Sequence, residues 1–300
     1  MPHDDILPDA AEISFYREHG WYASRKIFTE GEIEAASEAV HAFYDGHRDR
    51  PLPPQLKLEP FQNWTPGMDS GRLRSNDHIV MQSDVIREFA LKPLVGEVAG
   101  ILAQTDEVRL FNSSLVYKPP TNAEVSAQVG WHVDRAYWQT CTSEKMLTAW
   151  IPLHDCDENM GTITMVDGSH RWAESESLGK LRNGRTFATD DVESLEWRLR
   201  KAGHSFVTNP IKLRKGEVSF HHCLTFHGSG PNRSTNPRIS IIVHLQDSEN
   251  EYRPAFTDDG IPISYHADAM CRKSQIGYPD YTDPDVFPVL WQAASVSAPA

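Results

Sequence analysis

Two side chains suited to metal chemistry stand two residues apart in the segment Gly130-Trp-His-Val-Asp-Arg-Ala-Tyr-Trp. His132 offers an imidazole nitrogen and Asp134 a carboxylate oxygen. On an extended strand, residues i and i+2 project from the same face, so we expect the two groups to converge on one point. A His-x-Asp pair is nevertheless common by chance and is usually a surface pair. A metal site therefore requires a third ligand.

Another histidine would complete the two-His-one-carboxylate triad, which suits iron(II) and leaves coordination positions open. About ninety residues downstream, the segment Phe220-His-His-Cys-Leu-Thr-Phe-His-Gly-Ser-Gly offers His221, His222 and His227, where a strand ends and a glycine-rich turn begins. Spacing does not choose among the three. Gly228 favours its neighbour His227, because a position without a side chain lets a metal and its ligands approach the backbone.

The motifs His132-Val-Asp134 and His227-Gly-Ser-Gly-Pro-Asn, followed by Arg238, resemble the phytanoyl-CoA dioxygenase family of iron(II)/2-oxoglutarate enzymes. The resemblance covers residues 12–245, and its other segments are Phe15-Tyr-Arg-Glu-His-Gly-Trp, Tyr117-Lys-Pro-Pro and Gly161-Thr-Ile-Thr-Met-Val-Asp-Gly-Ser-His-Arg. It implies that His132, Asp134 and His227 bind Fe(II), and that 2-oxoglutarate and O2 are co-substrates.

The resemblance also implies which residues hold 2-oxoglutarate. In the family, an arginine eleven residues after the distal histidine binds the far carboxylate, and Arg238 stands at that position. An arginine suits this role because its guanidinium can form two parallel hydrogen bonds to one carboxylate. Ser229 would donate a hydroxyl hydrogen bond to the same carboxylate, and Trp150 would form an aromatic wall. His221 and His222 would then be core residues or would orient the ligands.

Three further segments could contribute to the pocket. Asn112 and Ser114 share one face of the predicted strand 108–117, and Asn112 is predicted to contact the co-substrate if that face is the inner one. Tyr137 could line the substrate entrance, although ordinary sheet packing explains it equally well. The polar segment Arg72-Leu-Arg-Ser-Asn-Asp-His lies where similar enzymes place substrate-contacting loops. A solvated face explains it equally well, so it is left out of the predicted site.

The elements that must position these residues change character along the chain. Residues 12–45 predict two helices, the second opened by a capping box at Thr29, and residues 85–104 predict further helices around Pro93. From residue 106 onward short strands dominate. They are predicted at 108–117, 147–153, 161–166, 211–213, 217–220 and 238–245, with one helix at 190–202.

Helices followed by many short strands indicate an all-β core with a helical buttress, arranged as a double-stranded β-helix of the cupin-like jelly-roll type. We expect one domain over residues 1–300, with a helical part at 12–105, the jelly-roll core at 106–247 and a C-terminal extension at 248–300. The extension has no clear periodicity. Its aromatic residues indicate packing rather than disorder, and it could help to close the site.

Charge and composition limit the classes of molecule that the chain is expected to bind. The chain has 29 Lys and Arg against 42 Asp and Glu, a net charge of −13 that disfavours nucleic acid and anionic membranes as partners. A neutral or cationic small molecule fits better. No signal peptide or apolar run of membrane-spanning length is evident, which predicts a soluble, cytoplasmic protein. The four cysteines are widely spaced and are expected to be reduced and buried; oligomeric state is not indicated.

The predicted function is an Fe(II)/2-oxoglutarate-dependent dioxygenase that hydroxylates an unactivated C–H bond of a polar small molecule, such as an amino acid derivative or a specialised metabolite. Succinate and CO2 would be released. Related halogenases replace the carboxylate ligand with a small residue, so Asp134 favours hydroxylation. Desaturation, cyclisation or epimerisation with the same cofactors stays open. So do a jelly-roll module that binds a ligand without turnover and a cupin-like metalloenzyme without 2-oxoglutarate, which would not need Arg238.

Overall fold

A large antiparallel sheet carries most of the residues predicted to do chemistry. The computed structural model describes residues 5–68, 71–121, 127–183 and 192–294, and within them this sheet has seven strands. Six of them lie in the order β1-β8-β5-β10-β3-β13, and β2 also pairs with β3. The strands are β1 (Trp21–Ala23), β2 (Arg74–Asp77), β3 (Glu107–Lys118), β5 (Leu147–Pro152), β8 (Ser219–His222), β10 (Arg238–Asp247) and β13 (Val289–Gln292).

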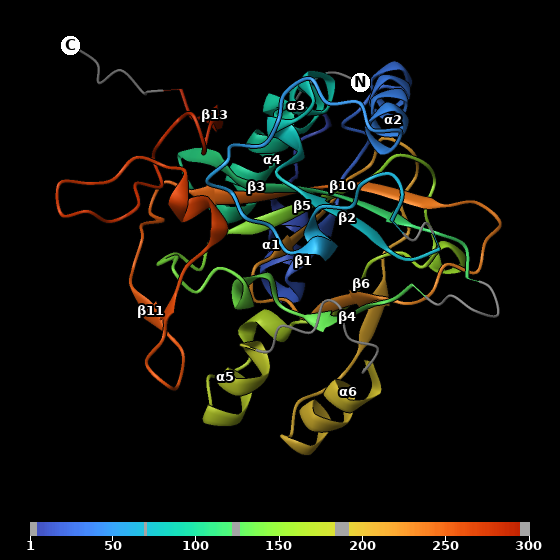
Figure 1. Cartoon of the computed structure of the whole chain (residues 1–300). Helices are drawn as coiled ribbons and strands as arrows, with labels where there is room; N and C mark the ends of the chain where they lie inside the picture. Colours follow the sequence, from blue (N-terminus) through green and yellow to red (C-terminus); the bar gives the residue numbers. More distant parts are fainter. Residues whose placement is uncertain (1–4, 69–70, 122–126, 184–191, 295–300) are drawn as a thin grey trace, which may run out of the picture.

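A smaller sheet lies on one side of the large one, where Figure 1 shows its strands β4 and β6. Within the described residues it has the order β4-β9-β6-β7, and all its pairs are antiparallel. These strands are β4 (Val129–His132), β6 (Thr164–Val166), β7 (Thr208–Pro210) and β9 (His227–Ser229), and a separate hairpin joins β11 (Ala255–Phe256) to β12 (Pro262–Ile263). Two antiparallel sheets of this kind confirm the predicted jelly-roll core.

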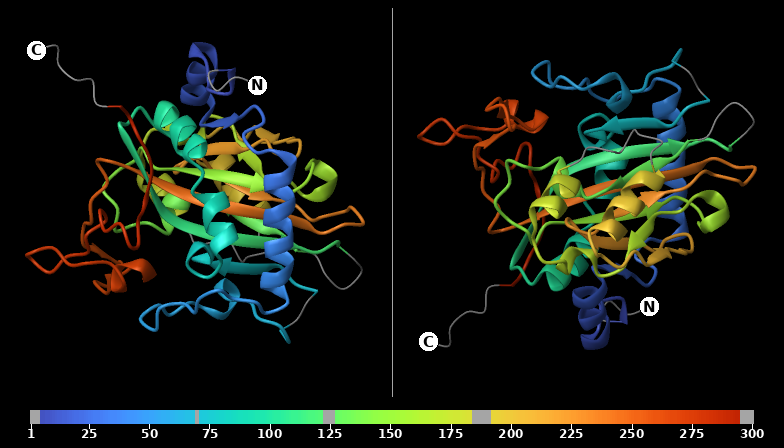
Figure 2. Two further views of the ribbon diagram at one scale, coloured as in Figure 1. Left: turned by 90° about the horizontal axis from the view of Figure 1, so that it is seen from above. Right: turned by 90° about the horizontal axis from the view of Figure 1, so that it is seen from below.

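Helices cover the other face of the large sheet, as Figures 1 and 2 show. They are α2 (Glu30–Tyr44), α3 (Asp84–Ala90) and α4 (Pro93–Ala103), while α1 (Ala10–His19) precedes β1. The predicted capping box is present: Thr29 accepts a hydrogen bond from the Glu32 backbone, and Glu32 accepts one from the Thr29 backbone. Two more helices, α5 (Glu176–Arg182) and α6 (Val192–Lys201), lie beyond the small sheet. Residues 190 and 191 of the predicted helix 190–202 lie outside the described residues.

The alternation of side chains along β10 shows how one strand serves two environments. Ile239, Ile241 and Val243 are buried in the apolar core that includes the helices. The residues between and beside them, Arg238, Ile242 and His244, line a cavity on the opposite face. Because side chains alternate across a strand, burying one face against the helices aims the other set toward the small sheet.

Several predicted element boundaries are wrong. Residues 211–213 do not form a strand; the nearby strand is β7, and Leu213 makes only an isolated bridge to Cys156. The predicted strand 161–166 is shorter, and β1, β2, β9, β11, β12 and β13 were not predicted; β9 lies where a glycine-rich turn was expected. All of these missed strands are four residues or shorter, and β2 is composed of Arg, Ser, Asn and Asp, residues that favour loops unless tertiary pairing holds them.

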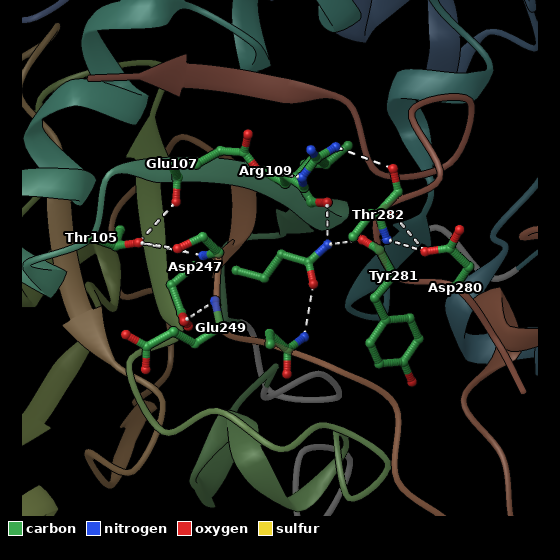
Figure 3. Close-up of polar contacts among 12 residues, drawn as sticks. Thr105, Glu107, Arg109, Asp247, Glu249, Asp280, Tyr281 and Thr282 are labelled. Carbon is green, nitrogen blue, oxygen red and sulfur yellow. Dashed lines mark hydrogen bonds and ion pairs between the residues drawn. The ribbon is translucent and has the colours of Figure 1, made fainter. Parts of the chain in front are cut away.

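The C-terminal extension is packed against the sheet, as its aromatic residues indicated. Strand β13 pairs with β3, and Figure 3 shows Arg109 donating a hydrogen bond to the carbonyl of Thr282 (3.2 Å). Gln246 donates a further hydrogen bond to the carbonyl of Tyr281 (2.9 Å). Tyr265 and Tyr281 are buried, whereas Tyr278 is 43% exposed. The extension is thus tied to β3 and β10 by backbone pairing and by side chains.

Two other sequence features can be checked in the structure. All four cysteines are free and buried, as predicted. Among the described residues, no helix has both the length and the apolar character needed to cross a membrane.

The capping box makes a prediction about stability. Replacing Thr29 with Ala removes the side-chain acceptor at the start of α2 and should lower the free energy of unfolding by about 1 kcal/mol. Denaturant titration would measure this. Ser37→Ala, in the same helix but away from its end, should change the free energy of unfolding little. Equal stability of Thr29→Ala and wild type would contradict the assigned cap.

Candidate functional site

Three predicted metal ligands meet at one place. One ligand atom each of His132, Asp134 and His227 lies within 4.8 Å of the others. The Nε2 atoms of His132 and His227 lie 3.9 and 3.6 Å from Asp134 Oδ1. Strands β4 and β9 bring the histidines together, because His132 pairs directly with His227. All three side chains are buried.

The local geometry differs from the expected strand. β4 ends at His132, and Asp134 opens a 3-10 turn over residues 134–136. The turn, rather than strand alternation, aims the carboxylate at the imidazoles. The reason given for His227 is also corrected: a Cβ on Gly228 would lie 3.0 Å from the carbonyl oxygen of Val129 and 3.2 Å from the Trp131 ring. The absence of a side chain at Gly228 therefore leaves room for the neighbouring strand β4.

Both imidazoles are held with Nε2 facing the cluster. The Nδ1 atom of His132 lies 2.8 Å from the carbonyl oxygen of Gly130, and that of His227 lies 3.0 Å from the carbonyl oxygen of Thr225. Each Nδ1 therefore carries the proton and donates, which leaves Nε2 as the free lone pair. Burial lowers the pKa of His132, and burial and the neighbouring imidazoles lower the pKa of His227 well below its usual range. Neutral imidazoles are the form that binds metal.

Asp134 is fixed by hydrogen bonds on its other oxygen. Thr148 donates to Oδ2 (2.5 Å), and His221 Nε2 lies 3.2 Å from the same atom. Burial alone would raise the pKa of Asp134, but His227, His221 and His244 outweigh it, and the pKa lies well below its usual range. His221 thus contacts a ligand, as expected of an orienting residue. Two neutral imidazoles and one ionised carboxylate fit a divalent iron ion.

Arg238 is buried in the same cavity without a neutralising partner. Its Nη1 donates to the carbonyl of Gly161 (3.3 Å), its guanidinium carbon lies 5.3 Å from the centre of the Trp150 ring, and its Nε has no hydrogen-bond partner. Within the described part of the chain, no carboxylate forms an ion pair with it. Burial lowers the pKa of Arg238 to about 10, so it remains a cation at neutral pH. A buried, unpaired guanidinium suits a carboxylate ligand.

Lys118 is a residue that the sequence reasoning missed. It is fully buried, and its Nζ donates to Ser229 Oγ (2.5 Å) and to the carbonyl of Gly230 (2.6 Å). Because Ser229 Oγ accepts from Lys118, its own proton is free to be donated. Burial and then the Arg238 charge push the pKa of Lys118 well below its usual range. Lys118 pairs with Arg238 in register and shares the face of Asn112, so strand alternation could have identified it.

The predicted residues line one cavity of about 560 Å³. Its walls include the metal cluster together with Asn112, Tyr137, Trp150, Ser229 and Arg238. Sequence reasoning missed three parts of the wall. They are Asp77 on β2, the segment that contributes Lys57, Glu59, Phe61 and Gln62, and Ser264, Tyr265 and His266 of the C-terminal extension. The roles of the individual residues remain predictions.

The sequence also matches a protein-family model. The model of the phytanoyl-CoA dioxygenase family matches residues 16–240 of the chain. The chain belongs to the phytanoyl-CoA dioxygenase family. The resemblance predicted from the motifs is thereby confirmed, and the matched range includes the three clustered residues and Arg238.

Curated relatives in and around this family differ in their named reactions. A probable alpha-ketoglutarate-dependent hypophosphite dioxygenase of Stutzerimonas stutzeri is 31% identical over 144 residues, which are 46% of this chain and 45% of that protein. An ectoine dioxygenase of Bordetella bronchiseptica is 26% identical over 82% of this chain and 77% of its own. The match spans about half the length of the first curated relatives.

Solved structures confirm the fold. The alpha-ketoglutarate-dependent epimerase SnoN from nogalamycin biosynthesis superposes with a TM-score of 0.65 at 23% identity, over 93% of this chain and 97% of its own. EctD from S. alaskensis, solved with 2-oxoglutarate and 5-hydroxyectoine, gives a TM-score of 0.64 at 20% identity, over 92% and 87% of the chains. At these identities the likeness establishes the shared jelly roll.

The hydrogen bonds around Asp134 make a prediction about metal affinity. Thr148→Val removes the donor to Oδ2 and should weaken Fe(II) or Mn(II) binding about tenfold, whereas His227→Ala should abolish it. Anaerobic calorimetric titration would measure both. Thr140→Val, which alters a buried threonine hydrogen-bonded to Tyr281, is the control and should leave metal affinity unchanged. Unchanged affinity in Thr148→Val would show that Asp134 does not need this contact.

Proposed function

We propose that the chain is an iron(II)- and 2-oxoglutarate-dependent dioxygenase that hydroxylates a polar small molecule and releases succinate and carbon dioxide. One observation carries the proposal: a His-Asp-His cluster suited to iron(II) shares a cavity with a buried arginine that no carboxylate of the described residues neutralises. A co-substrate that both chelates a metal and carries a distal carboxylate matches this pair of features.

Each residue of the site would have a separate role in binding the metal or the co-substrate. His132, Asp134 and His227 would hold iron(II), which when bound supplies coordination positions for the co-substrate and for oxygen. Arg238 would pair with the far carboxylate of 2-oxoglutarate, and Ser229 would donate its hydroxyl proton to that group. Trp150, whose ring lies against the Arg238 guanidinium, would form the wall beside it.

The comparisons support this class of reaction and leave several products possible. Of two relatives matched over most of both chains, one is named an ectoine dioxygenase and the other a peroxisomal phytanoyl-CoA dioxygenase. Structural neighbours include an epimerase and a carbocyclase that depend on alpha-ketoglutarate. Asp134 occupies the ligand position, which favours hydroxylation over halogenation. Epimerisation or cyclisation is the alternative, and neither would insert an oxygen atom from O2 into the substrate.

The co-substrate assignment can be tested without knowing the substrate. Anaerobic addition of Fe(II) and then 2-oxoglutarate to the purified protein should produce the weak visible charge-transfer band of the iron chelate. Both His227→Ala and Arg238→Ala should lose the band at 2-oxoglutarate concentrations that saturate the wild type. Arg238→Ala should weaken 2-oxoglutarate binding about a hundredfold, because the truncated side chain leaves the co-substrate carboxylate buried without a partner.

Arg233→Ala is the control, because Arg233 is an exposed arginine four residues after Ser229 in the sequence. It should bind 2-oxoglutarate as the wild type does. No band in the wild type would overturn the 2-oxoglutarate assignment and favour another metal chemistry or a ligand-binding function.

The contact between Lys118 and Ser229 makes a separate prediction. Lys118→Met keeps the bulk of the side chain but removes the donor that orients Ser229, and it should weaken 2-oxoglutarate binding about tenfold without changing Fe(II) affinity. Calorimetric titrations of each would separate the two effects. Lys212→Met, at an exposed position, should bind both as the wild type does. A parallel loss of Fe(II) affinity in Lys118→Met would indicate a general disturbance of the cavity.

A further inference from the structure

Asp77 is a charged residue outside the metal cluster that also lines the cavity. Asp77 is the last residue of β2 and is 8% exposed. Ser114, its direct partner on β3, donates to Oδ1 (2.6 Å), and Gln62 donates to Oδ2 (2.9 Å). The backbone of Glu59 donates in turn to Gln62 Oε1 (3.1 Å). Asp77 is thus held in place, whereas the sequence allowed it to be part of a solvated face.

Asp77 carries a charge that the protein does not neutralise. No lysine or arginine in the described part of the chain forms an ion pair with it. His266 Nε2 lies 3.7 Å from Asp77 Oδ2, and the His266 imidazole is hydrogen-bonded to His78 (2.6 Å). Burial lowers the pKa of His266 to about 4, so it is neutral. Burial raises the pKa of Asp77 to about 6 against its two hydrogen bonds, which leaves it ionised at neutral pH.

A buried carboxylate without a cation is costly, and the two neutral hydrogen bonds offset only part of that cost. A second acceptor lies on the same wall. Asn112, two residues before Ser114 on β3, is buried, and its Oδ1 has no hydrogen-bond partner. The β2–β3 side of the cavity therefore presents a carboxylate without a counter-charge and a carbonyl oxygen without a donor. A ligand with a positive charge and N–H groups would satisfy both.

The remaining wall shows what the rest of such a ligand would be. Phe61, Tyr137, Trp138 and Tyr265 line the same cavity, so an organic body would lie against aromatic rings. The anion-binding groups, Arg238 and Ser229, come from β10 and β9, whereas Asp77 comes from the sheet margin at β2. Arg238 and Asp77 thus place opposite charges on different strands of one cavity, which Lys57 and Glu59 also line.

We propose that Asp77 recognises a protonated nitrogen group, a primary ammonium or an amidinium, on the substrate, so that the substrate is an organic cation. This inference rests on the proposed dioxygenase function. Pairing with Asp77 would fix one end of the substrate at β2 and leave another carbon free to face the metal cluster. An anionic substrate would instead meet the uncompensated carboxylate, and a neutral one would leave it unpaired.

The test uses three probes of nearly the same shape: benzamidine, benzamide and benzoate. Their affinities would be measured by ligand-observed NMR titration of the anaerobic protein, loaded with Fe(II) and 2-oxoglutarate and also without them. Benzamidine should bind at least tenfold more tightly than benzamide, and benzoate should bind most weakly at this position. Asp77→Asn should lose at least tenfold in benzamidine affinity and change benzamide affinity less than threefold.

Glu38→Gln is the matched charge control. Glu38 is an exposed carboxylate on α2, on the far side of the large sheet, and its loss should leave benzamidine binding unchanged. Equal affinity of the wild type for benzamidine and benzamide would overturn the proposal even if Asp77→Asn failed to fold. So would unchanged benzamidine binding in a folded Asp77→Asn variant. Failure of the dioxygenase assignment is seen separately, as the absence of the 2-oxoglutarate chelate band.

Discussion

The antiparallel pairing of β10 with β3 and β5 is the constraint on which the rest of the structure depends. It pairs residues 240–245 with a strand on each side, so that this part of β10 has one face toward the helices and the other toward the small sheet. The apolar set is buried under α2, α3 and α4. The alternate set includes Arg238 and Ser240, which are polar and buried at the same time, a combination that is tolerated only where hydrogen bonds or ligands satisfy such groups. The candidate site thus lies on the face of the large sheet opposite to the face that packs in the hydrophobic core.

The cavity is consequently a place where charges are separated rather than paired. Asp134 is stabilised by imidazoles and a hydroxyl, Arg238 by a carbonyl and an aromatic ring, and Asp77 by a hydroxyl and an amide. None of the three forms an ion pair with an oppositely charged lysine, arginine or carboxylate of the described residues. Such an arrangement lowers stability in the ligand-free protein and increases the gain when complementary groups bind.

The metal cluster and the jelly roll could be predicted because both leave signals in short stretches of sequence. His132, Asp134 and His227 are identified by their residue types together with the glycine-rich segment, and the long strands β3, β5 and β10 by their apolar runs. The missing parts depend on pairing between distant segments. β2 is polar throughout, and only its pairing with β3 makes it a strand and buries Asp77. Strand alternation places Lys118 on the face of Asn112, but only its pairing with Arg238 shows that this end of β3 is buried.

The C-terminal extension has an evolutionary consequence. Ser264, Tyr265 and His266 form part of the cavity wall, yet they lie beyond residues 16–240, the range matched by the family model. The metal cluster and Arg238 lie inside that range. The segment is held through β13 to residues 107–109 of β3 and through Tyr281 to Gln246 near the end of β10, at positions separate from the cavity-lining residues of the same strands. Insertions and substitutions in it would therefore change the shape of the cavity wall while leaving the metal cluster and Arg238 unchanged, so that related chains can differ in this wall alone.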